Sequence, residues 1–335
     1  MSERDNFSRE TKFDRVYKIE IPPPTYIPLS EVFKEQGIPV ESYDISVYLG
    51  RHATQQDAQD FLDFAQDADI IVPERIMWYK GDVSHYLYDV FSESTVKDYD
   101  LLIQEYGLNK IPPSHDKQFY LGLFKGIKGT KKKILFIDDE DFDTVDLEDI
   151  KSIFKFDYSD DIVNMNIHSA TEVYWNKFKR FVEFQIGREN RSIERIQSGM
   201  VELLKRHPEL IMSKLKIAFF WGALHERFAE ILKNAGESVY IKKGYPLTMG
   251  MHIAAKKLSA GMVLDEVEMQ HLTLESIFWE ILQRYSHDTH TFKILSSLMP
   301  KLLLRGTNEE VYNILSKAYN DREYADVLIE TLLKE

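Results

Sequence analysis

The first half of the chain contains two apolar runs separated by a helical pattern. The run at residues 45–49 ends at Gly50, and the second run occupies residues 70–72. Between them, apolar positions recur at helical spacing after Thr54, which has Asp57 three residues later as an approximate capping box. A strand, a helix and a strand of these lengths predict a right-handed parallel crossover, the βαβ unit.

A later stretch repeats this order of elements. Residues 217–221 are apolar and end at Gly222. A helical face follows and closes at Gly236, and residues 238–241 form the second run. Because both stretches place a strand before a glycine and a helix after it, they predict an internal repeat of the βαβ type.

Most of the remaining chain is predicted to be helical. Residues 172–206 form one long helix with a stripe of apolar side chains, and the sequence beyond Pro246 is amphipathic and helical. A further strand is predicted at residues 134–137, after three lysines. We therefore predict an α/β fold with a central, mostly parallel sheet built from two βαβ-type repeats with helical insertions, plus a helical C-terminal module.

These patterns divide the chain into three parts. Residues 1–40 are expected to be an extended N-terminal arm, because the three consecutive prolines at 22–24 lack backbone donors and hold an extended backbone. Residues 41–245 are expected to form the α/β domain. Residues 246–335 are expected to form the helical C-terminal module, which could pack on the sheet or mediate dimerisation.

Composition narrows the classes of function. The chain has 335 residues, 44% of them hydrophobic, so we expect a substantial core. Its formal net charge of -13 disfavours binding to nucleic acid or anionic lipid. The absence of cysteine excludes disulfides, a thiol nucleophile and a zinc–thiolate site. Residues 1–15 have no apolar segment of the secretory type, and no apolar stretch approaches the ~20 residues of a membrane span, so we expect a cytoplasmic protein without a membrane span.

Four ionisable side chains follow predicted strand ends, where open α/β sheets bind their ligands. They are His52, Glu74, Asp138 and His225. Two imidazoles and a carboxylate are a competent ligand set for a divalent metal ion, which would activate a bound water as nucleophile. Without a metal, the same groups could act as a histidine general base with an orienting carboxylate. The residues leave both chemistries open, while Asp138 belongs to an acidic run that a solvated surface explains better.

Glu189 lies on the apolar stripe of the long predicted helix, where packing alone would not select a charge. A buried carboxylate requires a partner, so we expect either a buried ion-pair network or a place in the site. Its neighbours Arg188 and Arg191 are candidates to bind a substrate carboxylate or to stabilise an oxyanion. An exposed, arginine-rich helical turn is the alternative.

Four short motifs occur in a fixed order between residues 45 and 243. Residues 48–52 (Tyr-Leu-Gly-Arg-His) are followed by residues 70–74 (Ile-Ile-Val-Pro-Glu), by residues 188–193 (Arg-Glu-Asn-Arg-Ser-Ile) and by residues 222–225 (Gly-Ala-Leu-His). In this order they resemble the TraB/Tiki/ChaN/erythromycin-esterase-like superfamily, which has two Gly-x-x-His motifs, a glutamate after the second strand and an arginine-containing helix. The first motif here is one residue shorter. The resemblance implies an α/β fold with the site at the strand ends and helical insertions covering it.

The resemblance also implies roles for particular residues. His52, Glu74 and His225 would bind a divalent metal ion, such as manganese, zinc, cobalt or iron, or would activate water directly. Arg188 or Arg191 would stabilise negative charge. Members of the superfamily include metal-dependent peptidases, ester hydrolases and proteins that handle haem or iron, and likeness of fold does not select among these roles.

The leading hypothesis from the sequence is a cytoplasmic, metal-dependent hydrolase that cleaves a peptide or related acyl bond in a small-molecule or peptide substrate. One alternative is a metal-free, esterase-like hydrolase that uses histidine and glutamate as acid and base. Another is a non-catalytic binding or signalling protein that keeps the fold. In each case the C-terminal helices could form a homodimer or contact a protein partner.

Overall fold

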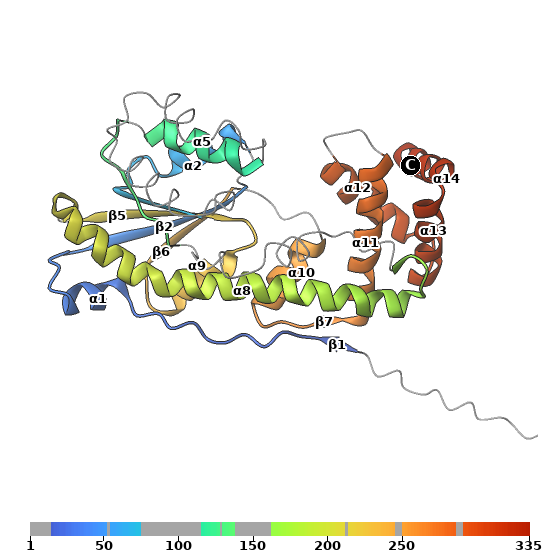
Figure 1. Cartoon of the computed structure of the whole chain (residues 1–335), viewed down its shortest axis with the longest axis horizontal. Coiled ribbons are helices and arrows are strands. Elements are labelled where there is room, and N and C mark those ends of the chain that lie inside the picture. The colour runs from blue at the N-terminus through green and yellow to red at the C-terminus, as the bar shows by residue number, and fades with distance from the viewer. Residues whose placement is uncertain are drawn as a thin grey trace, which may run out of the picture. The chain divides into compact units, whose positions relative to one another are not determined.

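A parallel sheet covered by helices forms the centre of the α/β part of the protein (Figure 1). The computed structural model describes residues 15–51, 54–74, 115–127, 129–137, 162–211, 214–244, 250–285 and 291–335. The chain divides into two compact units. The α/β unit comprises residues 21–154 and 180–248, and the helical unit comprises residues 1–20, 155–179 and 249–335.

Five strands make up the sheet in the described part of the α/β unit, and they lie in the order β4–β3–β5–β2–β6. They are β2 (Tyr43–Gly50), β3 (Ile70–Pro73), β4 (Lys133–Ile134), β5 (Leu215–Gly222) and β6 (Val239–Lys243). Every neighbouring pair is parallel, which confirms the predicted α/β class. The two longest strands, β2 and β5, lie next to each other and are mostly buried, as expected for strands covered on both faces.

β4 is shorter than the apolar run at residues 134–137 predicts. The backbone N–H of Glu74 donates to Phe220 of β5, so the preceding residue of β3 directs its nitrogen toward β4. That residue is Pro73, which has no N–H. The ladder between β3 and β4 therefore stops there.

The two βαβ units are interleaved. β5 lies between β2 and β3, and β2 lies between β5 and β6. β2 and β5 pair in register along their whole length, with Gly50 opposite Gly222. The strand ends of both units therefore reach the same edge of the sheet at the same level.

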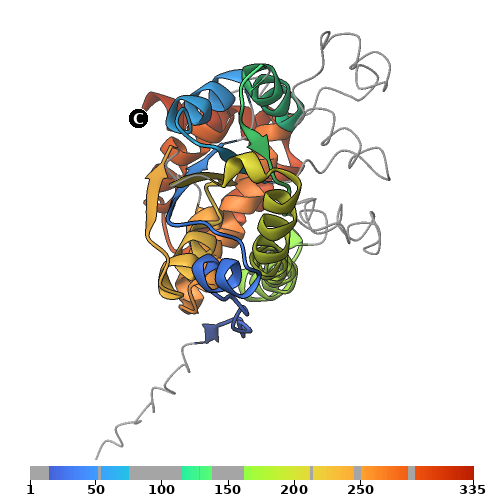
Figure 2. The same cartoon turned by 90° about the vertical axis from the view of Figure 1, so that its left-hand side faces the viewer.

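Helices cover both faces of this sheet (Figure 2). α2 (Gln55–Phe64) and α5 (His115–Ile127) pack on one face through an aromatic cluster that includes Phe61, Phe119 and Phe220. The other face is covered by α1 (Leu29–Glu35), α9 (Glu226–Asn234) and the part of α8 (Ile167–Arg206) that belongs to the α/β unit. A 3-10 turn at Pro208–Leu210 leads from α8 toward β5. α2 begins at the predicted capping box, since Thr54 and Asp57 each bond the backbone of the other.

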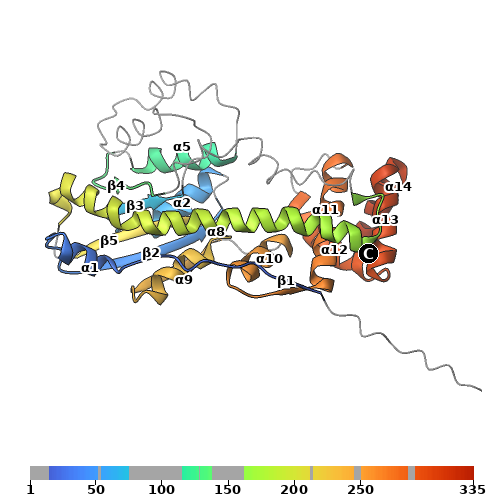
Figure 3. The ribbon, with the colours of Figure 1, turned by 60° about the horizontal axis from the view of Figure 1, so that its bottom comes forward.

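The region expected to be an extended arm contains a helix, α1. Leu29, Val32 and Phe33 of α1 are buried, and Leu29 and Phe33 belong to the core on this face of the sheet, so tertiary packing supports a helix of only seven residues. The segment that leads into α1, residues 21–28, is not helical; we call it the arm segment, and it runs beside α8 (Figure 3).

Glu237 attaches this region to the sheet. Its buried carboxylate accepts hydrogen bonds from the hydroxyls of Tyr26 and Tyr43, each at 2.7 Å, and from the backbone N–H of Leu29 at 2.8 Å. Burial and the carboxylate raise the pKa of Tyr43 to about 12. The start of α1 is thus fixed by an acidic side chain at its N-terminus.

The helical unit confirms the predicted C-terminal helices. It contains the first part of α8, then α10 (Gly250–Ser259), α11 (Glu266–Tyr285), α12 (Thr291–Leu303), α13 (Asn308–Asn320) and α14 (Arg322–Lys334). A two-residue strand that the pattern does not predict, β7 (Leu264–Asp265), pairs antiparallel with β1 (Val16–Tyr17). α11 is buried along most of its length by its neighbours in this unit. Across the described ranges, the helices lack the combined length and apolar character needed to cross a membrane.

Candidate active site

Two of the predicted site residues meet at the ends of neighbouring strands. Glu74 directly follows β3, and its backbone N–H donates to Phe220 of β5 at 2.8 Å. His225 comes after Gly222, the last residue of β5, and its N–H donates to the Gly222 carbonyl at 2.9 Å. This tight turn places His225 directly before α9, so both side chains start at the carboxyl edge of the sheet.

Glu74 contacts both Arg188 and His225. Its Oε1 lies 2.7 Å from Nη2 of Arg188 and 3.3 Å from Nε2 of His225, and its Oε2 accepts the backbone N–H of Gly222 at 2.6 Å. The side chains of Glu74, Arg188 and His225 are all less than 7% exposed. A carboxylate, a guanidinium and an imidazole from three separate parts of the chain therefore share one buried position.

Glu189 forms the second half of the site. Its Oε1 accepts a hydrogen bond from Nδ1 of His225 at 2.8 Å, and its Oε2 accepts one from Nη1 of Arg227 at 3.0 Å. Nη2 of the same guanidinium donates to Oδ1 of Asn190 at 2.7 Å. The expectation that a charge on the apolar stripe needs a partner is confirmed, and the partners are His225 and Arg227.

The surrounding carboxylates keep His225 charged. Burial opposes the imidazolium and by itself lowers the pKa of His225, but the negative charge of Glu74 and the hydrogen bonds to Glu189 and Glu74 outweigh it. Together these effects raise the pKa from 6.5 to about 9. At neutral pH both ring nitrogens therefore carry protons and both face carboxylates.

Aromatic side chains form the apolar wall of this cluster. Trp221, the residue before Gly222, is fully buried and stacks on Phe228 with ring centroids 4.3 Å apart. Its indole meets the ring of His225 edge to face at 5.2 Å, and the guanidinium of Arg188 lies 5.8 Å from its ring centroid. Such an apolar wall lowers the local dielectric and strengthens the ion pairs beside it.

The structure settles the positions of four of the five predicted site residues. It brings Glu74, Arg188 and His225 together. Arg191 is half-buried, and its Nη1 lies beside Gly187 on the same helix, 3.3 Å from where a Cβ of that residue would be. His52 lies outside the described residues, as does Asp138.

Sequence reasoning missed Arg227. This residue sits two positions after His225, in the first turn of α9, and no spacing rule connects it with Glu189, 38 residues earlier in the chain. The available indication was the unpaired charge on the apolar stripe of α8, which required a cation from some other element. The pattern showed the need for a partner without identifying it.

A divalent metal ion at this site would need several free donor atoms. Within the described ranges, no group of three or more histidine, aspartate or glutamate side chains is arranged to hold one. Nε2 of His225 lies 3.3 Å from Oε1 of Glu74 and would have to lose its proton before it could bind a metal ion. Arg188 already occupies Oε1 of Glu74. As they stand, Glu74, Glu189 and His225 form a proton-sharing ion network, and His52, the third predicted metal ligand, lies outside the described residues.

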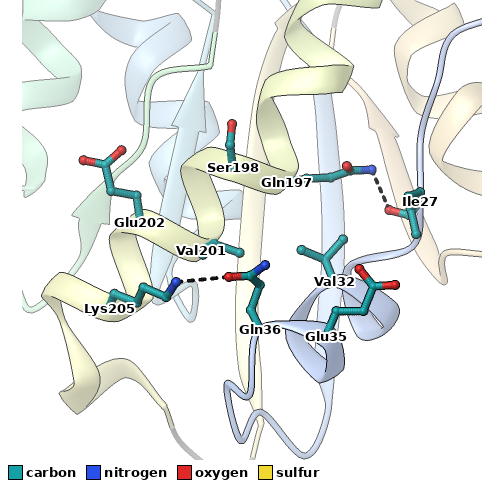
Figure 4. A pocket seen from close by; sticks show the side chains of 9 residues that line it. All are labelled: Ile27, Val32, Glu35, Gln36, Gln197, Ser198, Val201, Glu202 and Lys205. Atoms are coloured by element: carbon teal, nitrogen blue, oxygen red, sulfur yellow. Dashed lines mark hydrogen bonds between the residues drawn. The ribbon is translucent and has the colours of Figure 1, made fainter.

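A groove of about 490 Å³ lies between α1 and α8, and its lining on α8 begins at Gln197, roughly 12 Å along the helix from Glu189 (Figure 4). Two hydrogen bonds cross it, from Nε2 of Gln197 to the Ile27 carbonyl at 2.9 Å and from Nζ of Lys205 to Oε1 of Gln36 at 3.1 Å. Its lining contains no histidine and no buried charge. The groove is therefore separate from the charged cluster in both position and chemistry.

Comparison with known proteins identified no matching family model, no matching curated protein and no matching solved structure. The resemblance to the TraB/Tiki/ChaN/erythromycin-esterase-like superfamily accordingly rests on the order of the short motifs alone.

Proposed function

We propose that this protein is a hydrolase that cleaves an ester or amide bond by acid–base chemistry, with Glu74, His225 and Arg188 as its catalytic residues. The observation that carries the proposal is that Arg188 and His225 both lie within 3.3 Å of the Glu74 carboxylate, at the carboxyl edge of a parallel sheet. Ligands of open α/β sheets bind at that edge. Strongly perturbed titratable groups are also typical of catalytic sites.

The three side chains supply complementary roles. Glu74 accepts a proton from a water molecule as the water oxygen bonds to the acyl carbon. Arg188 exchanges its contact with Glu74 for the acyl oxygen and stabilises the negative charge that develops there. His225, an imidazolium, donates the proton on Nε2 to the leaving oxygen or nitrogen as the acyl bond breaks.

The protons balance over one cycle. After the bond breaks, Glu74 holds the proton taken from water and His225 is neutral. The 3.3 Å separation between Oε1 of Glu74 and Nε2 of His225 allows that proton to pass back to the imidazole. Glu189, on Nδ1, keeps the imidazole ring in place during both transfers.

A metal-independent mechanism is favoured because the described donors are already paired with protons and guanidinium groups. The metal-dependent version proposed from the sequence would need His225 to lose a proton, Arg188 to leave Glu74, and His52 to complete the ligand set. It therefore predicts hydrolysis that is lost on chelation. A cytoplasmic location is part of the same proposal and rests on the sequence alone.

One observation favours a rival function. Every member of the cluster has a charged partner, as in an ion network that only holds elements together. A binding or signalling protein that keeps the fold would show this network and no hydrolysis. The location argues against that rival, because a costly set of buried charges lies where substrates bind in this class of sheet.

The test is a panel of small ester and amide substrates, with and without a chelator. Glu74→Gln and His225→Gln should each lower any hydrolysis found by at least about 100-fold. His207→Gln is the matched control, because it removes a histidine–glutamate contact that is partly exposed and lies before β5. Hydrolysis that all three variants retain would exclude the proposed site. No hydrolysis across the panel would support the binding or signalling protein.

A further inference from the structure

A chain of polar contacts runs from the arm segment to the imidazole of His225. It starts at the backbone carbonyl of Pro22, which accepts a hydrogen bond from Nδ2 of Asn190 at 3.3 Å. Oδ1 of the same amide accepts one from Arg227, and Arg227 in turn donates to Glu189. Glu189 then contacts Nδ1 of His225. Each link is a direct contact between described residues of the α/β unit.

Asparagine is chemically suited to its place in this chain. The arginine side requires an acceptor and the carbonyl side requires a donor, and a primary amide supplies one of each. The orientation of the Asn190 amide is therefore determined by its two neighbours. The carbonyl it meets belongs to the first of three consecutive prolines, whose restricted backbone gives that anchor a defined position.

Arg227 is similarly constrained. Its side chain is 9% exposed and uses two different nitrogens for Glu189 and Asn190. The planar guanidinium fixes the direction between these two contacts. Glu189 thus receives His225 on one oxygen and Arg227 on the other, which leaves little freedom for its carboxylate to rotate.

From this geometry we propose that Asn190 and Arg227 are positioning residues of the site, and that the arm segment anchors them. They hold the Glu189 carboxylate in the orientation that keeps Nδ1 of His225 bonded, so that Nε2 faces Glu74. This inference rests on the proposed function for its catalytic consequence. Its structural part, the chain from Pro22 to His225, stands on the contacts alone.

A neighbouring contact on α8 provides a matched control. Gln197, about two turns beyond Asn190, also donates an amide hydrogen bond to a carbonyl of the arm segment, that of Ile27 (Figure 4). The side chain of Gln197 does not belong to the chain that ends at His225. Gln197→Ala and Asn190→Ala therefore both remove one bond between α8 and the arm segment, and only Asn190→Ala removes a contact with Arg227.

The experiment uses the proton on Nδ1 of His225 as its readout. In the 335-residue chain, NMR of imidazole N–H protons should show a solvent-protected proton that is absent in His225→Gln. In Asn190→Ala, and in Arg227→Met, we expect this proton to exchange with solvent at least about tenfold faster or to be lost, because the carboxylate it bonds is no longer held. In Gln197→Ala we expect it to be unchanged.

Two results would overturn the inference. One is a proton that stays equally protected in Asn190→Ala. The other is equal loss in Gln197→Ala, which would mean that attachment of the arm segment matters and the polar chain does not. The measurement needs no substrate, so its failure is separate from failure of the hydrolase proposal. If a substrate is found, Asn190→Ala should lower kcat with little change in KM, and Gln197→Ala should change neither.

Discussion

The ionisation of His225 should make the stability of the α/β unit depend on pH in a defined direction. The pKa of this imidazole is raised from 6.5 to about 9 in the folded protein. A group with a raised folded pKa stabilises the fold fully below its unfolded pKa, and this contribution is lost as the pH rises through the folded pKa. The difference in pKa corresponds to roughly 3 kcal/mol, at 1.36 kcal/mol per unit.

That amount is a large fraction of the 5–15 kcal/mol that stabilises a typical domain. The quantity to compare is the free energy of unfolding of the wild-type protein minus that of His225→Gln. We expect this difference to be roughly 3 kcal/mol larger at pH 6 than at pH 10. The fall should be concentrated between pH 6.5 and 9. Urea unfolding followed by circular dichroism at several pH values measures it.

His207→Gln serves as the control, because it removes a partly exposed histidine whose Nδ1 lies 3.0 Å from the carboxylate of Glu209. The His207→Gln variant keeps the contacts of His225, so its free energy of unfolding should still fall relative to that of His225→Gln between pH 6.5 and 9. The reasoning is refuted if the difference between wild type and His225→Gln stays constant from pH 6 to pH 10. It is also refuted if that difference grows with pH, since this would mean that His225 is neutral in the folded state.

Three further results are expected. Glu237→Ala should lower the free energy of unfolding by at least about 3 kcal/mol, because it leaves two tyrosine hydroxyls and one buried N–H without their acceptor. Glu35→Ala, on the exposed side of α1, should change the free energy of unfolding by under about 0.5 kcal/mol. Equal effects of the two substitutions would contradict the role of Glu237. Lys132→Met should speed amide hydrogen exchange in the turn that follows α2, because the ammonium group binds the carbonyls of Ala65 and Ala68 there. Lys131→Met, at an exposed position, should not. A chelator should leave hydrolysis of any substrate found unchanged, and loss that zinc or manganese restores would favour the metal-dependent mechanism.

The strands were predictable because their residues are buried on both faces. Long apolar runs such as residues 45–49 and 217–221 have few other places in a folded chain, and the glycine after each run marked its end correctly. The order of the strands was not predictable from the pattern. Interleaving of the two βαβ units depends on which strands pair across more than 160 residues, and apolar runs of similar composition do not encode that choice.

The helix α1 was not predicted, because it is stabilised mainly by contacts with residues far away in the sequence. α1 is short, follows a proline-rich segment, and is held by burial of Leu29 and Phe33 and by the distant Glu237. Local sequence therefore predicted an extended arm there.

The candidate site was predictable to the extent that strand topology determines it. Glu74 and His225 follow strands that end at one edge of the sheet, so their meeting required only a parallel arrangement. Arg227 depends on the side-chain direction at the start of α9, which no sequence period reports. Glu189 indicated that such a partner existed, because a buried carboxylate without one is too costly.

The central claim is that Glu74 and His225 act as one catalytic unit. A double-mutant cycle on the rate of acyl hydrolysis tests it most directly, with wild type, Glu74→Gln, His225→Gln and the double variant compared on one substrate. Residues that act together lose almost everything with the first substitution, so the double variant should be about as slow as either single variant. If the two losses multiply, or if neither substitution slows the reaction, the two side chains do not share the chemistry.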